Sequence, residues 1–140
     1  MIEEKDIKRL IRSAFEGQER SYSPYSKYRV GAAILTADGR IFTGCNIENA
    51  AFTPGDCAER TAVCKAVSEG CKDFEAIAVV GGASGKAPDM AYPCGVCRQV
   101  LREFVEPDKF EVIVARSEDD YERYTLEELL PKSFGPANLG

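Results

Sequence analysis

The chain has 140 residues, of which 44% are hydrophobic and 29% charged, and this composition is typical of one globular domain with its own core, here spanning 1–140. A formal net charge of −5 argues against nucleic acid as a partner, because phosphate backbones are bound by clustered lysines and arginines. The charged start "MIEEKDIKRL" lacks the apolar segment of a secretory leader, and no run of roughly 18 apolar residues indicates a membrane span, so we expect a cytoplasmic protein with no membrane partner.

The first part of the chain predicts a helix followed by a β-hairpin. Apolar residues recur at helical spacing between charged ones, which indicates an amphipathic helix over residues 4–17. The segment "YRVGAAILT" predicts a strand over 28–36. Asp38-Gly39 then turns the chain back into "RIFTGCN", so we expect a hairpin at this end of the protein.

The rest of the chain predicts alternating helices and strands. In order, these are a helix over about 57–69, a buried strand over 74–81, a loop over 81–93, a helix over 94–105, a buried strand over 110–116 and a short helix over 125–131. Thr125 and Glu128 form the capping-box pattern of the last helix, and Pro131, Gly135 and Pro136 are expected to prevent regular structure after it. This order predicts the α/β class, as a three-layer sandwich around a mixed β-sheet.

The sequence contains no histidine and six cysteines. The lack of histidine removes the usual general base and the usual nitrogen ligand of zinc. In a cytoplasmic protein, as expected here, cysteines are more often thiols or metal ligands than disulfides. Any acid–base chemistry must therefore use a carboxylate, a thiol, a lysine or a tyrosine.

Three of the cysteines are predicted at helix N-termini. Cys57 begins one helix, and Cys94 and Cys97 flank the start of another. Unpaired N–H groups and the positive end of the helix dipole favour thiolate over thiol at such positions. Two helices on one face of a sheet can bring these ends together, so the three sulfurs could bind one ion. Three thiolates suit zinc and leave its fourth position free for water, as in catalytic sites.

Glu59 is the candidate proton carrier beside this site. It follows Cys57 by two residues, so in the first helical turn it can project towards the ion without binding it. A carboxylate next to a zinc-bound water can take over the acid–base work that histidine does elsewhere. Arg60 and Arg98 are expected to bond to the sulfurs and to offset their negative charge.

Other interpretations of the cysteines remain open on spacing alone. A lone CxxC also fits a structural zinc knuckle, a redox pair or ordinary buried cysteines. Cys45 could supply a fourth sulfur, which would close the metal site and make it structural. Two turns of helix place Cys64 ~10 Å from Cys57, so it cannot easily share an ion with Cys57, and Cys71 is farther still. Cys64 is expected in the core, as cysteines usually are.

Cys57-Ala58-Glu59 followed by Pro93-Cys94-x-x-Cys97 matches the three-cysteine form of the zinc deaminase signature. Five longer segments extend the resemblance over residues 22–136: "SPYSKYRVGAAI", "GCNIENAAF", "CAERTAVCKAVSEG", "PCGVCRQV" and "ELLPKSFGP". Together they resemble the small homotetrameric cytidine deaminases. The resemblance implies a cytidine deaminase-like fold and hydrolytic deamination of cytidine and deoxycytidine to the uridines, with release of ammonia.

The resemblance also implies roles for particular residues. Cys57, Cys94 and Cys97 would bind one zinc ion per chain. Glu59 would pass a proton from the zinc-bound water to the pyrimidine N3 and a second proton to the departing amine. The implied substrate-binding residues are Asn46 and Glu48 for the ribose hydroxyls, the Ala58 N–H for the base carbonyl, and Tyr28 and Phe134 for stacking on the ring. Arg60, Arg98 and Gln99 would surround the metal ligands, and Phe134 would reach a neighbouring subunit's site in a homotetramer.

One run of residues and one single position depart from the common pattern of that family. The run Thr53 to Asp56 contains a glycine and partly resembles the blasticidin S deaminases. Tyr92 precedes Pro93 where a small residue is more usual. A deaminase of another cytosine nucleoside, such as blasticidin S, is therefore one alternative function. The other is a non-catalytic zinc-stabilised interaction domain, in which Glu59 would only be a carboxylate favoured by the helix dipole.

Overall fold

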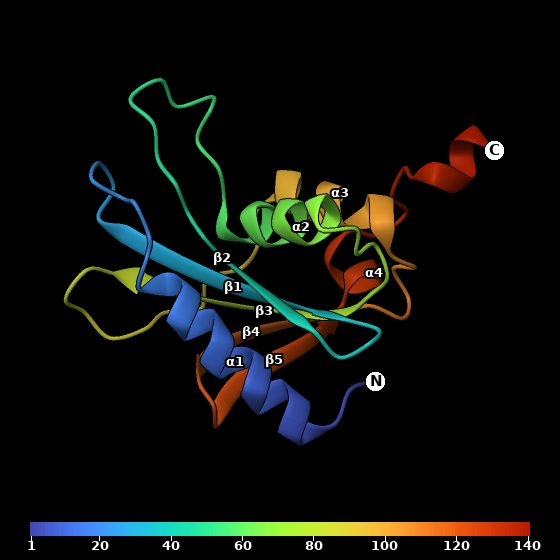
Figure 1. Cartoon of the computed structure of the whole chain (residues 1–140), viewed down its shortest axis with the longest axis horizontal. Coiled ribbons are helices and arrows are strands. Elements are labelled where there is room, and N and C mark those ends of the chain that lie inside the picture. The colour runs from blue at the N-terminus through green and yellow to red at the C-terminus, as the bar shows by residue number, and fades with distance from the viewer.

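A computed structural model describes residues 1–140 and has three layers, as the sequence predicts (Figure 1). Helix α1 covers one face of a five-stranded sheet, and helices α2, α3 and α4 cover the other. In chain order the elements are α1 Glu4–Gln18, β1 Tyr28–Thr36, β2 Ile41–Cys45, α2 Ala58–Ser68, β3 Phe74–Ala83, α3 Gly95–Phe104, β4 Glu111–Ser117, β5 Asp120–Thr125, α4 Leu126–Leu129 and the 3₁₀ helix η1 Pro136–Leu139.

The sheet is mixed, with strand order β2-β1-β3-β4-β5. Strands β3 and β4 are parallel, and all other neighbouring pairs are antiparallel. A parallel pair needs a crossover connection, and α3 supplies it between β3 and β4. Since helices cover both faces, the central strands are buried on both sides, which explains the continuous apolar runs that predicted them.

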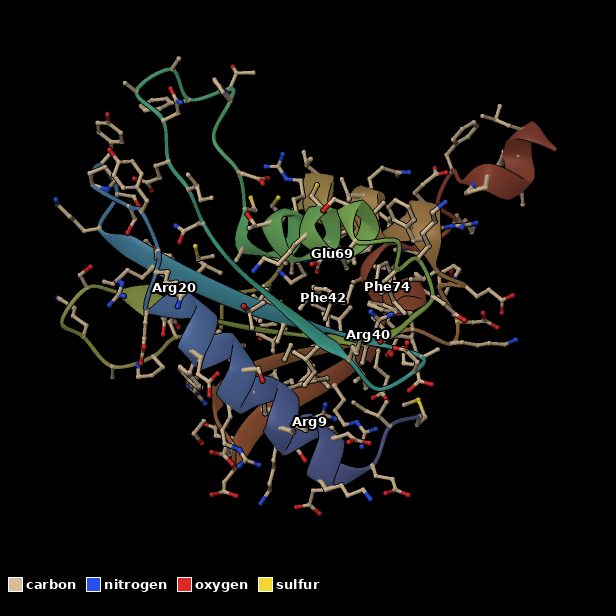
Figure 2. The ribbon with its side chains drawn as sticks, in the orientation of Figure 1. Arg9, Arg20, Arg40, Phe42, Glu69 and Phe74 are labelled. Atoms are coloured by element: carbon tan, nitrogen blue, oxygen red, sulfur yellow. The ribbon has the colours of Figure 1, made fainter.

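Two clusters of buried side chains join the layers. On one face, Ile7, Leu10 and Ile11 of α1 pack against alternate residues of β1, β3 and β4. On the other face, Phe42 of β2 lies beneath α2 (Figure 2), and the ring of Phe74 of β3 meets that of Phe104 of α3 edge to face. No helix is both long enough and apolar enough to cross a membrane.

Gly44 of β2 sets how closely α2 lies on the sheet. A Cβ atom at this position would be 2.4 Å from the Ala58 carbonyl oxygen and 2.5 Å from the Ala62 amide nitrogen. Because such distances are too short for any side chain, only glycine lets the first turn of α2 approach the strand this closely. This contact places Cys57 and Glu59 at their height above the sheet.

Two regular elements were not predicted. Strand β5 has the polar sequence "DYERYT" and no apolar run, because it is the edge strand and none of its residues is fully buried. The tail was expected to be irregular, but Pro136–Leu139 forms a 3₁₀ turn. Proline fits the first position of such a turn, since its missing N–H has no helical partner there. The predicted capping box between Thr125 and Glu128 is confirmed.

Candidate active site

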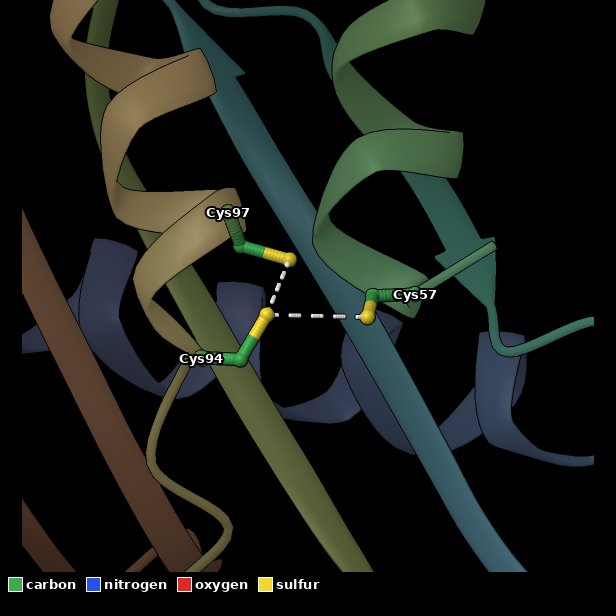
Figure 3. Close-up of side chains that lie close together, drawn as sticks. All are labelled: Cys57, Cys94 and Cys97. Atoms are coloured by element: carbon green, nitrogen blue, oxygen red, sulfur yellow. Dashed lines mark hydrogen bonds between the residues drawn. The ribbon is translucent and has the colours of Figure 1, made fainter. Parts of the chain in front are cut away.

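Three thiols come together where two helices begin (Figure 3). Cys57 is the N-cap of α2, Cys94 is the N-cap of α3, and Cys97 lies in the first turn of α3. The Sγ atoms of Cys94 and Cys97 are 3.4 Å apart, and those of Cys57 and Cys94 are 3.8 Å apart. All three sulfurs lie within 4.8 Å of one another. The predicted cluster is therefore assembled by the fold.

The geometry of these thiols fits a tetrahedral zinc ion. With Zn–S bonds of about 2.3 Å, tetrahedral coordination separates two sulfurs by roughly 3.8 Å, close to the separations in the cluster. Cys97 is buried and Cys94 is exposed, so the cluster has a protected side and an open side. Soft thiolate donors are a ligand set that zinc accepts.

The remaining cysteines lie outside the cluster. Cys45, the candidate fourth sulfur, donates instead to the backbone carbonyl of Arg20 at 3.4 Å. Cys71 is buried in the core. The expectation of a buried Cys64 was wrong, because α2 buries Ala62, Val63 and Ala66 and leaves Cys64 on its exposed side. The three-thiol site therefore keeps a position that the protein does not fill.

The local electrostatics favour a negative charge on Cys57. Its pKa is lowered to about 5, first by a hydrogen bond from the Cys97 thiol and then by Arg60, against the opposing effect of burial. The Arg60 Nη2 atom donates to Cys57 Sγ at 3.4 Å. The pKa of Cys97 is raised, first because its proton bonds to Cys57 and then because it is buried. Cys57 is thus the first of this pair to ionise.

Glu59 lies beside the thiols in a protected position. Its side chain is only 4% exposed, and burial raises its pKa to about 7. A carboxyl group with a pKa near neutrality can both accept and donate a proton at physiological pH. Buried carboxylates without a structural ion pair are typical of functional sites.

Two hollows meet at this site. The inner hollow, about 400 Å³, lies against the metal cluster and is lined by Tyr28 and Val30 of β1, by Ala58 and Glu59 of α2, and by Tyr92. The outer hollow, about 550 Å³, is lined by Tyr25, Ser26, Glu48, Phe52 and Arg60. Asn46 and Cys57 belong to both. A larger hollow of about 740 Å³ lies near the N-terminus and contains none of the three clustered cysteines.

Asn46 lies at the boundary of the two hollows and is held by β1. Its side-chain Nδ2 donates to the Tyr28 carbonyl at 2.8 Å, and its Oδ1 accepts from the Val30 N–H at 2.9 Å and from the Ser21 hydroxyl. The amide thus continues the pairing of β1 beyond the end of β2, which fixes its orientation.

Glu48 lies in the outer hollow and is held by the loop before β1. Its Oε1 accepts from the N–H groups of Tyr25 and Ser26 at 3.0 and 3.1 Å, and its Oε2 accepts from the Ser26 hydroxyl. These bonds, with that of the Ser26 side chain first, lower the pKa of Glu48. The carboxylate is therefore ionised and oriented at the rim of the hollow.

The three side chains expected around the metal ligands have different partners. Arg60 bonds to Cys57, as expected, and its Nε lies 3.4 Å from Asp56. Arg98 does not contact a sulfur: it donates to the carbonyls of Pro93 and Leu129, both at 2.7 Å, because the approach of α4 offers it backbone acceptors. Gln99 donates to the Phe134 carbonyl at 2.9 Å and so holds the C-terminal tail.

Phe134 lines neither hollow in the single chain. It is 58% exposed on the tail that follows α4. Arg102 donates to the Ser133 hydroxyl at 2.9 Å, so the tail is fixed against α3 on both sides of the Phe134 backbone. The ring itself projects from this anchored segment.

Two supports of the site were missed from the sequence. Asp56 pairs with Arg60, and the i,i+4 spacing of opposite charges could have revealed it. Ser26 binds Glu48 from 22 residues away, and no local pattern predicts a contact of that range.

Comparison with known proteins agrees with this geometry. Residues 4–113 match the family model described as the cytidine and deoxycytidylate deaminase zinc-binding region. The chain belongs to this deaminase family. It is 44% identical to the cytidine deaminase of Sporosarcina psychrophila over 134 residues, which cover 96% of this chain and 95% of that protein.

Solved structures of the deaminase family share the fold. A crystal structure of cytidine deaminase from Burkholderia pseudomallei has a TM-score of 0.80 and 42% identity, covering 90% of this chain and 97% of the other.

The sequence of a blasticidin-S deaminase from Bacillus cereus is also similar, at 34% identity over 78% of this chain and 79% of that protein. The predicted family, fold class, enzyme class and zinc-binding character of this deaminase are confirmed.

Proposed function

We propose that the protein catalyses the hydrolytic deamination of cytidine and deoxycytidine to uridine and deoxyuridine, with release of ammonia, in pyrimidine salvage. The observation that carries this proposal is a buried carboxylate, Glu59, beside three clustered thiols at the wall of a hollow that continues outward. The similarity to proteins named cytidine deaminase supports the same substrate.

Cys57, Cys94 and Cys97 are the proposed ligands of one zinc ion per chain. When bound, zinc would act as a Lewis acid that makes a water molecule a nucleophile at neutral pH. Arg60 would stabilise the thiolate of Cys57 through its bond at 3.4 Å. Arg98 would support the metal site indirectly, because it fixes the Pro93 carbonyl, which precedes the ligand Cys94.

Glu59 is the proposed proton carrier. It would accept a proton from the attacking water and deliver it to N3, while the water oxygen forms a bond to C4 of the pyrimidine. It would then transfer the second water proton to the amine, the C4–N bond would break, and ammonia would leave. One carboxylate thus serves as base and then as acid, which suits its pKa of about 7.

The two hollows suit the two halves of a nucleoside. The base would occupy the inner hollow, with Tyr28 against the ring and the Ala58 N–H on the base carbonyl, since this N–H lies in the first turn of α2 and has no helical acceptor. Asn46 and Glu48 would bind the ribose hydroxyls in the outer hollow. Its only cation, Arg60, already contacts Cys57 and Asp56, so the hollow offers no unpaired cation to a 5′-phosphate.

Glu48→Ala is expected to raise the KM for cytidine by on the order of tenfold with a smaller effect on kcat, because a charge-assisted hydrogen bond to the ribose is lost. The variant also frees the loop that carries Ser26, so Ser26→Ala is the control that loosens this loop and keeps the carboxylate. Steady-state kinetics measure both variants. An unchanged KM in Glu48→Ala, or an equal rise in Ser26→Ala, would contradict direct ribose binding by Glu48.

We propose further that the active enzyme is a homotetramer with shared sites. Phe134 is a large apolar side chain on an anchored tail, and neither hollow of its own chain contains it. In an assembly it would stack on the base bound by a neighbouring chain. The free thiols of all six cysteines suit action in the reducing cytoplasm.

Phe134→Ala, like truncation before Ser133, is expected to keep zinc and to lower kcat/KM for cytidine by about tenfold or more, because stacking of an aromatic side chain on a base is lost. Leu139→Ala is the matched control, since Leu139 is an exposed apolar residue of the same tail. Mixing Phe134→Ala chains with Glu59→Gln chains should restore part of the activity, because an intact Glu59 site can receive Phe134 from its neighbour. A fully active monomer in size-exclusion chromatography would contradict the shared site.

The alternatives differ in what they predict for the wild-type protein. A non-catalytic zinc domain has no need of a carboxylate that is only 4% exposed next to the thiols. A blasticidin S deaminase is favoured by the glycine-containing run before Cys57 and by the similarity to the Bacillus cereus protein. Ultraviolet assays with cytidine, deoxycytidine, cytidine 5′-monophosphate and blasticidin S separate these functions, and we expect turnover of the first two substrates.

A further inference from the structure

A tyrosine that the proposed reaction does not use lies at the rim of the inner hollow. Tyr92 lines this hollow together with Ala91 and Cys94, and it is 48% exposed. It comes directly before Pro93 and the proposed zinc ligand Cys94. Its ring therefore borders the space in which the base would approach the metal.

Strand β5 holds this ring in place. The Tyr92 hydroxyl donates to Glu122 Oε1 at 2.6 Å, and the Tyr124 hydroxyl donates to the same oxygen at 2.7 Å. The two rings meet edge to face, with centroids 6.4 Å apart. Glu122 is itself fixed by the pairing of β5 with β4, where it lies opposite Val114. The rim of the hollow is thus tied to the edge of the sheet.

We propose that Tyr92 selects among cytosine nucleosides by limiting the space beside C5 of the pyrimidine ring, and that Glu122 is the positioning residue that holds Tyr92 there. This inference rests on the proposed deaminase function. With C4 at the thiols and N3 at Glu59, the ring atom on the other side of C4 is C5. Glu59 comes from α2, whereas Tyr92 comes from the segment that leads into α3. Both residues line the inner hollow, so in the proposed placement the C5 edge of the base would face the Tyr92 rim.

The ratio of kcat/KM for cytidine to kcat/KM for 5-methylcytidine measures this selection in the zinc-loaded enzyme. We expect Tyr92→Ala to lower the ratio by about tenfold or more, since one extra methyl group against an apolar wall changes discrimination by roughly 10- to 200-fold. Glu122→Ala should lower it less, because the ring remains but is no longer held. Glu122→Gln should restore the wild-type ratio, because its amide oxygen can still accept both hydroxyl groups.

Tyr124→Phe is the matched control. It removes one phenol hydrogen bond to the same carboxylate but leaves the Tyr92 bond intact, so the ratio should equal that of the wild type. A ratio that Tyr92→Ala leaves unchanged, or an equal loss for both nucleosides with zinc retained, would overturn the proposal. A wild-type enzyme that converts neither nucleoside would overturn the deaminase function itself, and this inference with it.

Discussion

Glu59→Gln is expected to keep the fold and the zinc while turnover of cytidine falls by at least about 10²- to 10⁴-fold, the usual contribution of a positioned acid–base group. The amide has nearly the same shape as the carboxyl group, so it fits the same buried position, but it cannot accept the water proton or deliver protons to N3 and the amine. Steady-state kinetics with measured zinc content separate loss of chemistry from loss of metal.

Glu69→Gln is the control for this substitution. Glu69 is the exposed C-cap residue at the other end of α2, so the same chemical change occurs in the same helix but away from the site. Its activity should equal that of the wild type. Near-normal turnover by Glu59→Gln would show that another group carries the protons.

Cys97→Ala is expected to lower bound zinc from about one ion per chain to nearly none and to abolish turnover. Cys97 is fully buried, and the cluster contains no further cysteine that could replace its sulfur. Loss of a metal that binds only the folded chain should also lower Tm. Metal analysis after dialysis and a thermal melt measure the two effects.

Cys64→Ala is the matched control for Cys97→Ala, because it removes a thiol from the exposed side of α2 and leaves the cluster intact. It should retain one zinc ion and full activity. Spectroscopic evidence for four thiolates around the ion, with Cys45 among them, would contradict the open three-thiol site and favour a structural one.

The layers of the fold could be predicted because their signals are local. A helix buried on one face repeats its apolar residues every three to four positions, and a strand buried on both faces is continuously apolar. Strand β5 has neither signal: Tyr121 packs towards α1, Tyr124 packs towards the other layer, and charged residues lie between them. Only pairing with β4 identifies it as a strand.

The three thiols and Glu59 could be predicted for a similar reason. Their spacing places each of them at the start of a helix, and the fold then brings the two helix starts together. The partners of Arg98 and Glu48 could not be predicted, because they depend on how α4 and the loop before β1 pack in three dimensions. The same holds for the support of Tyr92 by β5.

The most direct test of zinc-dependent deamination through Glu59 is to measure the conversion of cytidine by the purified wild-type protein. Ultraviolet absorbance monitors the loss of cytidine, and a second assay measures the ammonia released. Glu59→Gln is measured in the same way at equal zinc content. We expect the wild type to form uridine and ammonia in a one-to-one ratio and the variant to form neither at a comparable rate. A zinc-loaded wild type that leaves cytidine and deoxycytidine unchanged would contradict the proposed cytidine deaminase activity.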